Sequence, residues 1–359
     1  MNKMIAFLFI AVVLLLNVYV GWRLWRIIPG GWVAKSIPVI LFFLWMALFF
    51  ISFIWIEKLP IGLATVTYNV GNLWLIAFLY LLLGFIFTRI AVLCHLLPAD
   101  FLRDSATGTC TLIGGVILLL SIGGFHYHHK YREEITIHTD KPLERPLKVV
   151  LMSDLHLGYH NRRAELGQWV DIINAEAPDL ILTAGDIVDR SIRPVIEGNY
   201  AEEFHRLKAP IWTVLGNHDY YTGEPMVEQF FKKAGIRLLR DEWAKFGDIT
   251  VIGRDDRTKR HRKPLHALTD SIEGFTILLD HQPYYLEEAE QAGIDFQFSG
   301  HTHRGQVWPI SWITDAMYEK SWGRYERADT KYYISSGIGI WGARVRIGSR
   351  SEYLVLNIE

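Results

Sequence analysis

Long apolar runs fill the first third of the chain. Four stretches, about 4–20, 37–56, 73–93 and 109–125, consist almost entirely of hydrophobic residues. At a rise of about 1.5 Å per residue, roughly 15 to 20 apolar residues cross a hydrocarbon core of about 30 Å as a helix. Buried helices of a large soluble domain normally show a polar face, and these stretches show none. The pattern therefore predicts four transmembrane helices in a first domain, residues 1–130.

The loops around these runs bear on their orientation. A cleaved signal peptide is the alternative for the first run, but no small-x-small cleavage site follows it and further apolar runs do. The first and third loops hold Arg23, Arg26, Lys35, Arg89 and Arg103, whereas the opposite arrangement would place Lys3, Lys58, Lys130 and Arg132 inside. Because cytoplasmic loops are richer in Lys and Arg, this slight excess favours a downstream domain on the outer face.

From about residue 131 the pattern changes to short strand-like segments separated by amphipathic helices. An alternating segment at 135–138 is expected as an edge strand, and the stretch Val149–Gly158 opens with a buried strand. Further strands are predicted at 180–183, 211–215, 249–252, 275–279, 296–299, 332–335 and 353–358, and helices at 163–176, 201–207 and 226–234. Strands and helices alternate early and strands dominate late, which predicts an α/β fold of two packed sheets flanked by helices in residues 131–359.

Composition and charge exclude some partners. The 37 basic and 38 acidic residues give a formal net charge of −1, so no global cationic field points to nucleic acid. The two cysteines, Cys94 and Cys110, both fall in the apolar part. A disulfide framework and a cysteine-rich zinc site are therefore excluded for the second domain. The histidine cluster at 126–129 is interpreted as a polar collar at the membrane surface.

Side chains of the kinds that bind metals gather where predicted strands end. The candidate ligands are Asp154, His156, Asp186, Asn217, His281, His301 and His303. Carboxylate, imidazole and amide donors without thiolates suit divalent Mn, Fe or Zn. Seven ligands exceed the usual complement of one ion. The pattern therefore predicts two divalent metal ions that share one bridging carboxylate.

Such a pair of metals has a clear chemical use. Two cations a few ångströms apart lower the pKa of a bridging water, so that hydroxide exists near neutral pH, and they neutralise phosphoryl oxygens during in-line displacement. His218 is the catalytic candidate, either as a hydrogen-bond donor to a phosphate oxygen or as the acid that protonates the leaving alkoxide. Arg190 either reaches a substrate phosphate or anchors its own loop through a carboxylate. These residues predict a hydrolase of phosphodiester or pyrophosphate bonds.

The order of these motifs resembles that of a known family. Five ordered blocks, Asp154-x-His156, Gly185-Asp186-x-x-Asp189-Arg190, Gly216-Asn217-His218-Asp219, His281 and Gly300-His301-x-His303, are similar to those of the calcineurin-like metallophosphoesterase superfamily. The resemblance covers about residues 133–359 and implies a four-layer α-β-β-α sandwich. It also implies one metal on Asp154, His156, Asp186 and His303, and a second on Asp186, Asn217, His281 and His301. His218 would then contact the phosphate or donate the proton.

Part of the resemblance is to a bacterial membrane-associated branch that includes YaeI- and YkuE-type phosphodiesterases. The segments 153–158, 299–306 and 336–342 carry this likeness. It implies an integral protein of the bacterial inner membrane, and a membrane anchor beside the site favours a lipid-linked substrate. Arg304 departs from the pattern, since many members have Gly after the second His, and it is a candidate substrate-binding residue. The four predicted spans also exceed the single anchor common in that branch.

Two other classes of protein remain to be weighed. A membrane receptor or scaffold that uses an inactive phosphoesterase domain for binding would be expected to lack some ligands, and none is missing. A transporter would be expected to carry ionisable residues inside its spans, and Asn17, Ser52 and His95 are too few and too peripheral. A membrane-anchored, metal-dependent phosphohydrolase is the preferred interpretation, with the receptor or scaffold as the alternative.

Overall fold

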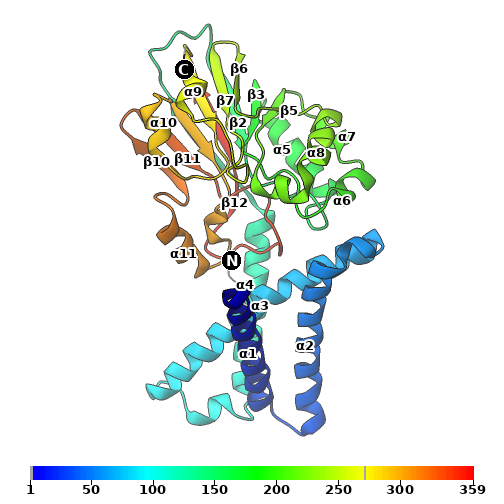
Figure 1. Cartoon of the computed structure of the whole chain (residues 1–359). Coiled ribbons are helices and arrows are strands. Elements are labelled where there is room, and N and C mark those ends of the chain that lie inside the picture. Colours follow the sequence, from blue (N-terminus) through cyan, green and yellow to red (C-terminus); the bar gives the residue numbers. More distant parts are fainter. Residues whose placement is uncertain (1–2, 271) are drawn as a thin grey trace. The chain divides into compact units, whose positions relative to one another are not determined.

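The chain folds into two compact units. The computed structural model describes residues 3–270 and 272–359, and it divides the chain into Met1–Gly124 and Phe125–Glu359 (Figure 1). This division falls inside the last helix of the apolar part, slightly before residue 130, where the sequence pattern puts it. Each unit is described by itself below.

Helices make up the first unit. They are α1 (Lys3–Ile27), α2 (Trp32–Ile54), η1 (Ile56–Lys58), α3 (Ile61–Leu93), η2 (Ala99–Leu102) and α4 (Ala106–His128), which continues into the second unit. The helices α2, α3 and α4 are long and apolar enough to cross a membrane. The first predicted span, 4–20, lies within α1, several of whose side chains fall outside the described residues, and it stays a prediction.

Helix α3 starts at Ile61, well before the predicted third span. Its added turns contain small and polar residues that are accommodated by packing against α2. A Cβ atom on Gly71 would lie only 2.9 Å from the Cα atom of Phe49, so glycine permits this close approach. The buried Asn72 donates its side-chain amide to the carbonyl oxygen of Tyr68 at 2.7 Å. Small residues and internally satisfied polar groups are what helices packed in a membrane require.

Two six-stranded sheets form the centre of the second unit. The first sheet has the order β1-β12-β2-β3-β4-β5, with β1 (Lys130–Ile137), β12 (Ser351–Ile358), β2 (Leu147–Met152), β3 (Leu180–Thr183), β4 (Ile211–Thr213) and β5 (Arg237–Leu238). The second has the order β10-β11-β9-β8-β7-β6, with β10 (Gly323–Arg327), β11 (Thr330–Ile334), β9 (Phe296–Ser299), β8 (Phe275–Leu279), β7 (Ile249–Gly253) and β6 (Glu242–Phe246). Neighbouring strands from β2 to β5, and from β11 to β7, run parallel.

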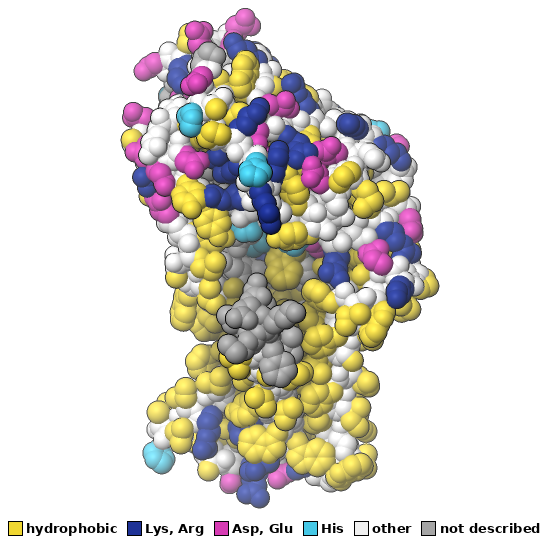
Figure 2. Space-filling model, in the orientation of Figure 1, with side chains coloured by type: hydrophobic (Ala, Val, Ile, Leu, Met, Phe, Trp, Pro, Cys, Tyr) yellow, Lys and Arg dark blue, Asp and Glu magenta, His cyan; other side chains and the backbone are white. Residues whose placement is uncertain are grey.

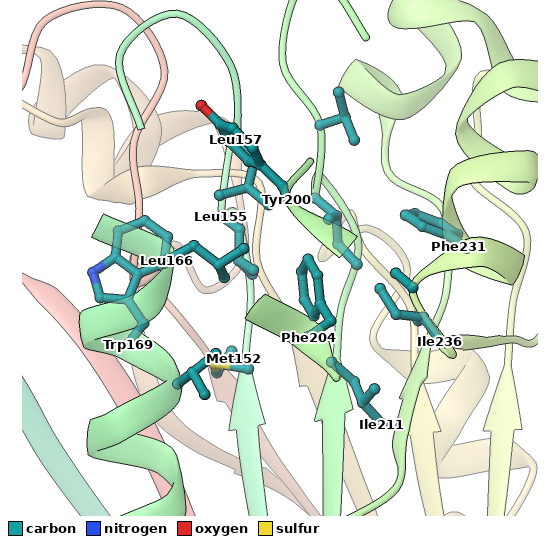
Figure 3. Close-up of a cluster of buried hydrophobic side chains, with 14 of the residues drawn as sticks. Met152, Leu155, Leu157, Leu166, Trp169, Tyr200, Phe204, Ile211, Phe231 and Ile236 are labelled. Atoms are coloured by element: carbon teal, nitrogen blue, oxygen red, sulfur yellow. The ribbon is translucent and has the colours of Figure 1, made fainter. Parts of the chain in front are cut away.

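The sheets face each other and helices cover their outer faces. One fully buried cluster between them joins Val149 and Leu151 of the first sheet to Val251 and Ile277 of the second. The helical elements of the second unit are α5 (Arg163–Ala175), α6 (Arg193–Glu197), α7 (Ala201–Phe204), α8 (Asn217–Lys233), α9 (His266–Thr269), α10 (Glu287–Gln291), η3 (His303–Gly305) and α11 (Ile310–Met317). Helices α5 to α8 pack on the first sheet (Figure 3), and α9 and α10 pack on the second. The predicted four-layer α-β-β-α sandwich is confirmed.

Three short strands were not predicted from the sequence, and two of them form the edges of the second sheet. These are β6 and β10, with the sequences EWAKF and GRYER, in which charged residues are frequent and Ala244 alone is buried. The third, β5, has two residues and closes one edge of the first sheet. Edge strands are short and charged in soluble proteins because exposed backbone there would otherwise pair with other chains. Because they are short and charged, these strands contain no apolar run from which the sequence could predict them.

Candidate metal centre

The loops that follow parallel strands carry all seven predicted ligands. Strand β2 ends just before Asp154 and His156, and β3 ends just before Asp186. Asn217 follows β4, His281 follows β8, and His301 and His303 follow β9. The carboxyl ends of parallel strands meet at one edge of a sheet, which is where α/β proteins place their sites. The fold therefore brings these loops together across two facing sheets.

These loops hold an unusual backbone conformation. Five predicted ligands have positive φ angles, namely Asp154 (56°), His156 (46°), Asp186 (53°), His301 (71°) and His303 (49°). The left-handed region is uncommon for residues other than glycine, and such residues cluster where function requires a fixed arrangement. The backbone thus marks the same positions as the chemistry of the side chains.

Two glycines allow the carboxylates to sit where they do. A Cβ atom on Gly216 would lie 2.2 Å from Oδ1 of Asp186, and one on Gly300 would lie 2.3 Å from Oδ2 of Asp154. Real Cβ atoms never approach an oxygen this closely. The glycines that precede Asn217 and His301 are therefore required by the packing of the neighbouring carboxylates.

Apolar side chains anchor the first ligand loop. Leu155 and Leu157 are fully buried among Leu166, Trp169 and other side chains between the first sheet and its helices (Figure 3). His156 lies between these two leucines in the sequence and is itself fully buried. Leucines held in a core fix the loop, so the imidazole of His156 is presented to the site with little freedom.

One group of donors consists of Asp154, His156 and His303. The Nε2 atoms of His156 and His303 are 3.1 Å apart, and Oδ1 of Asp154 lies 3.7 Å and 3.5 Å from them. Both Asp154 oxygens accept a hydrogen bond from the backbone N–H of His301 at 3.1 Å. Two imidazole nitrogens this close are what ligands of one ion at about 2.1 Å would show.

A second group consists of Asp186, His281 and His301. The Asn217 Oδ1 atom lies 3.1 Å from Nε2 of His281 and 2.7 Å from Nδ1 of His301, so the amide joins this group. Oδ2 of Asp186 is 3.2 Å from Nε2 of His281 and 3.6 Å from Nε2 of His156. One carboxylate oxygen thus stands between the two groups.

Hydrogen bonds behind the site set the tautomers of two histidines. Nδ1 of His281 donates to the carbonyl oxygen of Ala184 at 2.6 Å, and Nδ1 of His303 donates to that of Ser336 at 3.3 Å. The Nε2 atom of each ring therefore presents its lone pair to the site. Outer partners of this kind orient histidines that bind metals.

Electrostatics favour cations at both groups. Burial opposes a charge on His281, but Asp186 outweighs burial and raises the pKa of His281 well above its ordinary value. Burial likewise opposes a charge on His156, yet Asp154 and Asp189 raise its pKa to about 10. By contrast, burial lowers the pKa of His303 to about 3. The carboxylates thus draw positive charge into a buried site, and a divalent ion supplies it without protons.

The donor set fits divalent metal ions. Nitrogen and oxygen atoms gather in three close groups, the two described above and a third made of His156, Asp189 and His218. The described cysteines, Cys94 and Cys110, both belong to the first unit. Such sets of imidazole, carboxylate and amide groups suit Mn, Fe and Zn. The seven residues predicted from the sequence are the ones that would hold these ions.

His218 lies beside these groups with a partner of its own. Its ring is 4.7 Å from that of His156, and its Nδ1 atom is 2.5 Å from Oδ1 of Asp189. Its backbone N–H donates to Oδ1 of Asp186 at 2.8 Å. The buried Asp189 engages Nδ1, so Nε2 is the atom that His218 can offer to a substrate. The sequence analysis assigned no role to Asp189. Its position three residues after Asp186 is the signal that could have identified it.

The two predicted arginines occupy different surroundings. Arg190 is exposed and follows Asp189 on the same loop, with a φ angle of 65°. Arg304 also has a left-handed backbone, with φ 50° and ψ 38°, and its guanidinium lies 4.2 Å from the centre of the Trp322 ring. Glycine adopts this conformation without strain, which agrees with the Gly that the family resemblance leads us to expect at the Arg304 position.

Comparison with known proteins shows similarity to metallophosphoesterases. The family model for calcineurin-like phosphoesterases matches residues 147–305. A protein of Aquifex aeolicus named as an uncharacterized metallophosphoesterase is 31% identical over 240 residues, which cover 63% of this chain and 91% of that protein. One of Helicobacter pylori is 32% identical over 63% of each chain, so the match spans less than two thirds of that relative.

A vertebrate relative is named as a membrane protein. A zebrafish (Danio rerio) protein named as a transmembrane protein with metallophosphoesterase domain is 33% identical over 57% of this chain and 52% of its own length. With the apolar helices of the first unit, this similarity indicates association with a membrane. Residues 147–305, which the family model matches, include the loops after β2, β3, β4, β8 and β9 that carry the predicted ligands. The chain belongs to the calcineurin-like metallophosphoesterases.

Proposed function

We propose that this protein is a membrane-anchored, dimetal-dependent hydrolase of phosphodiester or pyrophosphate bonds. The observation that carries the proposal is the convergence of two groups of donors on a shared carboxylate, with Asp186 Oδ2 3.2 Å from His281 and 3.6 Å from His156. A site for a single ion would not need a second full set of donors.

Each side chain has a defined task in this proposal. Asp154, His156 and His303 hold one ion, Asn217, His281 and His301 hold the other, and Asp186 bridges them. When bound, such a pair of cations activates water for attack and neutralises the phosphoryl oxygens. The buried positions of the ligands keep the donor atoms fixed, so little reorganisation is needed during the reaction.

His218 is the proposed catalytic residue. Asp189 holds Nδ1 of the ring, so that Nε2 either donates a hydrogen bond to a phosphate oxygen or passes a proton to the leaving oxygen. Asp186 and Asp189 oppose the effect of burial and raise the pKa of His218 above its ordinary value. A raised pKa suits both tasks because it favours the protonated ring.

Arg190 and Arg304 are proposed as substrate contacts. Both side chains are on the ligand loops, and a guanidinium offers paired N–H donors that match a phosphate. Arg304 immediately follows the ligand His303 in the sequence. Its aromatic partner Trp322 would hold the guanidinium in place for a substrate group next to the metals.

The first unit is proposed as a multi-pass anchor in a cell membrane. Asp104 donates its backbone N–H to the carbonyl oxygen of Arg26 at 2.9 Å and pairs with Lys35, so the end of α1 and the start of α2 lie at one end of this unit. The basic residues of that end are Arg23, Arg26, Lys35, Arg89 and Arg103, and dark-blue side chains gather at the lower end of the helical unit in Figure 2. Because Lys and Arg prefer the cytoplasmic side, the opposite end, from which α4 leads into β1, would be outside.

A lipid-linked substrate follows from this placement. An enzyme tied to the bilayer meets lipid-bound diesters and pyrophosphates at a high local concentration. The alternative is a receptor or scaffold that binds a phosphorylated ligand without turnover. The complete set of donors favours the enzyme, since a binding module would not need to retain all of them.

The test is hydrolysis by the full chain in detergent micelles. The protein is stripped with a chelator, and Mn, Zn, Fe or Mg is added back before it is given an aryl phosphodiester or the matching monoester. We expect metal-dependent cleavage of the diester at a rate well above that of the monoester. Tight binding of the metals with no turnover of either substrate, or of a pyrophosphate, would favour the receptor.

A further inference from the structure

Helix α11 carries its apolar side chains on the outside. Trp312, Ile313 and Met317 are 65%, 54% and 59% exposed. With Pro309 and Ala316 they stand at positions i, i+3, i+4, i+7 and i+8, which is one continuous face of a helix. Such a face normally turns to the core of a domain, whereas α11 projects away from the two sheets of its unit (Figure 1). We call these five residues the α11 face.

The helix is attached directly to the loop that bears His303. Gly305 closes this loop with a φ angle of 69°, and a Cβ atom on it would lie 2.5 Å from the backbone nitrogen of Ser311 at the start of α11. At the other end of the helix, the Tyr318 ring lies 6.2 Å from that of His301. One end of α11 therefore packs against the loop that carries His303, and the residue after its other end lies near the ring of His301.

A row of stacked side chains joins this loop to the end of α4. The Arg304 guanidinium lies 4.2 Å from the Trp322 ring, and that of Arg350 lies 5.1 Å from Trp322 and 5.2 Å from Tyr131. The Tyr131 hydroxyl in turn lies 3.0 Å from Nδ1 of His126, in the last turn of α4. All of these residues belong to the second unit.

This row indicates which side of the second unit faces lipid. Helix α4 is one of the candidate membrane spans, so its last turn stands at the membrane interface when the helix spans. The stacked side chains place the loop of Arg304 on the same side of the unit as that turn. Arg304 and Lys320 offer positive charge to anionic headgroups. The acidic residues of the same segment are engaged elsewhere, Asp315 by Ser321 and Glu319 by Arg327.

We propose that the α11 face docks into the surface of the bilayer. Trp312, Ile313 and Met317 would lie at the boundary between headgroups and acyl chains, where amphipathic helices with tryptophan are stable. This contact would hold the metal centre against the lipid, so that a lipid-linked phosphate reaches it without leaving the membrane. The inference rests on the proposed membrane anchor and is independent of the proposed chemistry.

The direct test is the environment of a spin label on the full chain in lipid nanodiscs. The native cysteines are first removed as Cys94→Ala and Cys110→Ala, and a nitroxide is attached at Ile313→Cys. The matched control is Ile196→Cys on α6, because Ile196 is 55% exposed and Ile313 is 54% exposed. The discs contain phosphatidylcholine and phosphatidylglycerol, and collisions with oxygen and with a water-soluble nickel chelate are measured.

We expect the label at 313 to collide several-fold more with oxygen, and several-fold less with the nickel chelate, than the label at 196. Equal exposure of both labels to the chelate would overturn the proposal. Broadening between labels that disappears on dilution with unlabelled chain would show that a second copy covers the α11 face, and would also overturn it.

Turnover supplies a second readout. The double variant Trp312→Ser with Ile313→Ser should hydrolyse a soluble aryl diester at the native rate in detergent, and a lipid-linked diester several-fold more slowly in nanodiscs. An equal loss on both substrates would mean that α11 only supports the metal loop, against the proposal. If the native chain hydrolyses neither substrate, the proposed chemistry fails while the spin-label result still decides the docking.

Discussion

The pairing of Asp189 with His218 leads to a quantitative prediction for the variant Asp189→Asn. The 2.5 Å contact between Oδ1 and Nδ1 is a hydrogen bond to a charged group when the ring is protonated. Such bonds contribute about 1.5–3 kcal/mol. If the transition state uses the whole of this energy, the rate falls roughly 10- to 150-fold. His218→Ala removes the group itself and should cost about 10²- to 10⁴-fold.

A double-mutant cycle shows whether the two residues act together. The variant with both changes should be no slower than His218→Ala, because Asp189 then has no ring to orient. Metal content is measured for each variant, since Asp189 also lies 3.6 Å from Nδ1 of His156. All three variants should retain two ions per chain. Additive losses, or loss of metal from Asp189→Asn, would refute the assignment of Asp189 as the partner of His218.

The leaving group and the pH separate the two roles proposed for His218. If the ring protonates the leaving oxygen, His218→Ala should be much slower with an alkyl diester and little changed with an activated aryl diester. If it contacts a phosphate oxygen, both substrates should suffer equally. Because Asp189 raises the pKa of His218, Asp189→Asn lowers it, and the fall of activity at high pH should begin at a lower pH. An unshifted pH profile would argue against a protonated His218 in the reaction.

Other predictions follow from the same geometry. Asp186→Asn should abolish turnover and reduce the metal content below two ions per chain, as measured by elemental mass spectrometry, because the charge between the two groups is removed; native turnover would contradict a shared carboxylate. Gly300→Ala should lower metal affinity, since the new methyl group displaces the Asp154 carboxylate, whereas Gly115→Ala, with open space around it, should not. Arg304→Gly should stay within about 1 kcal/mol of native stability in thermal unfolding, because relief of the left-handed strain offsets the lost contact with Trp322; its KM should rise if the guanidinium contacts substrate. Saturating metal should raise the stability of the stripped protein by about 2.7 kcal/mol per site at 100 times Kd, and no thermal shift with any ion tested would contradict the metal site.

Local chemistry explains why much of this molecule is visible in its sequence. The apolar runs of α2, α3 and α4 can be recognised in the sequence because helices that are apolar enough to cross a membrane need no polar face. The buried strands β3, β8 and β9 coincide with the predicted segments, since strands covered on both faces are continuous apolar runs. Their ends point to the proposed ligand residues because a polar residue directly after such a run stands at the edge where parallel strands converge.

Contacts between distant residues were decided only by the tertiary structure. The edge strands β6 and β10 are held by pairing with β7 and β11 and not by their own hydrophobicity. Asp189 meets His218 from a different loop, and Arg350 lies between Tyr131 and Trp322, with nothing in the spacing to foretell either contact. The outward direction of the α11 face is of the same kind. An amphipathic pattern shows that a helix has an apolar side, but only the packing of its neighbours determines whether that side meets a core or a solvent.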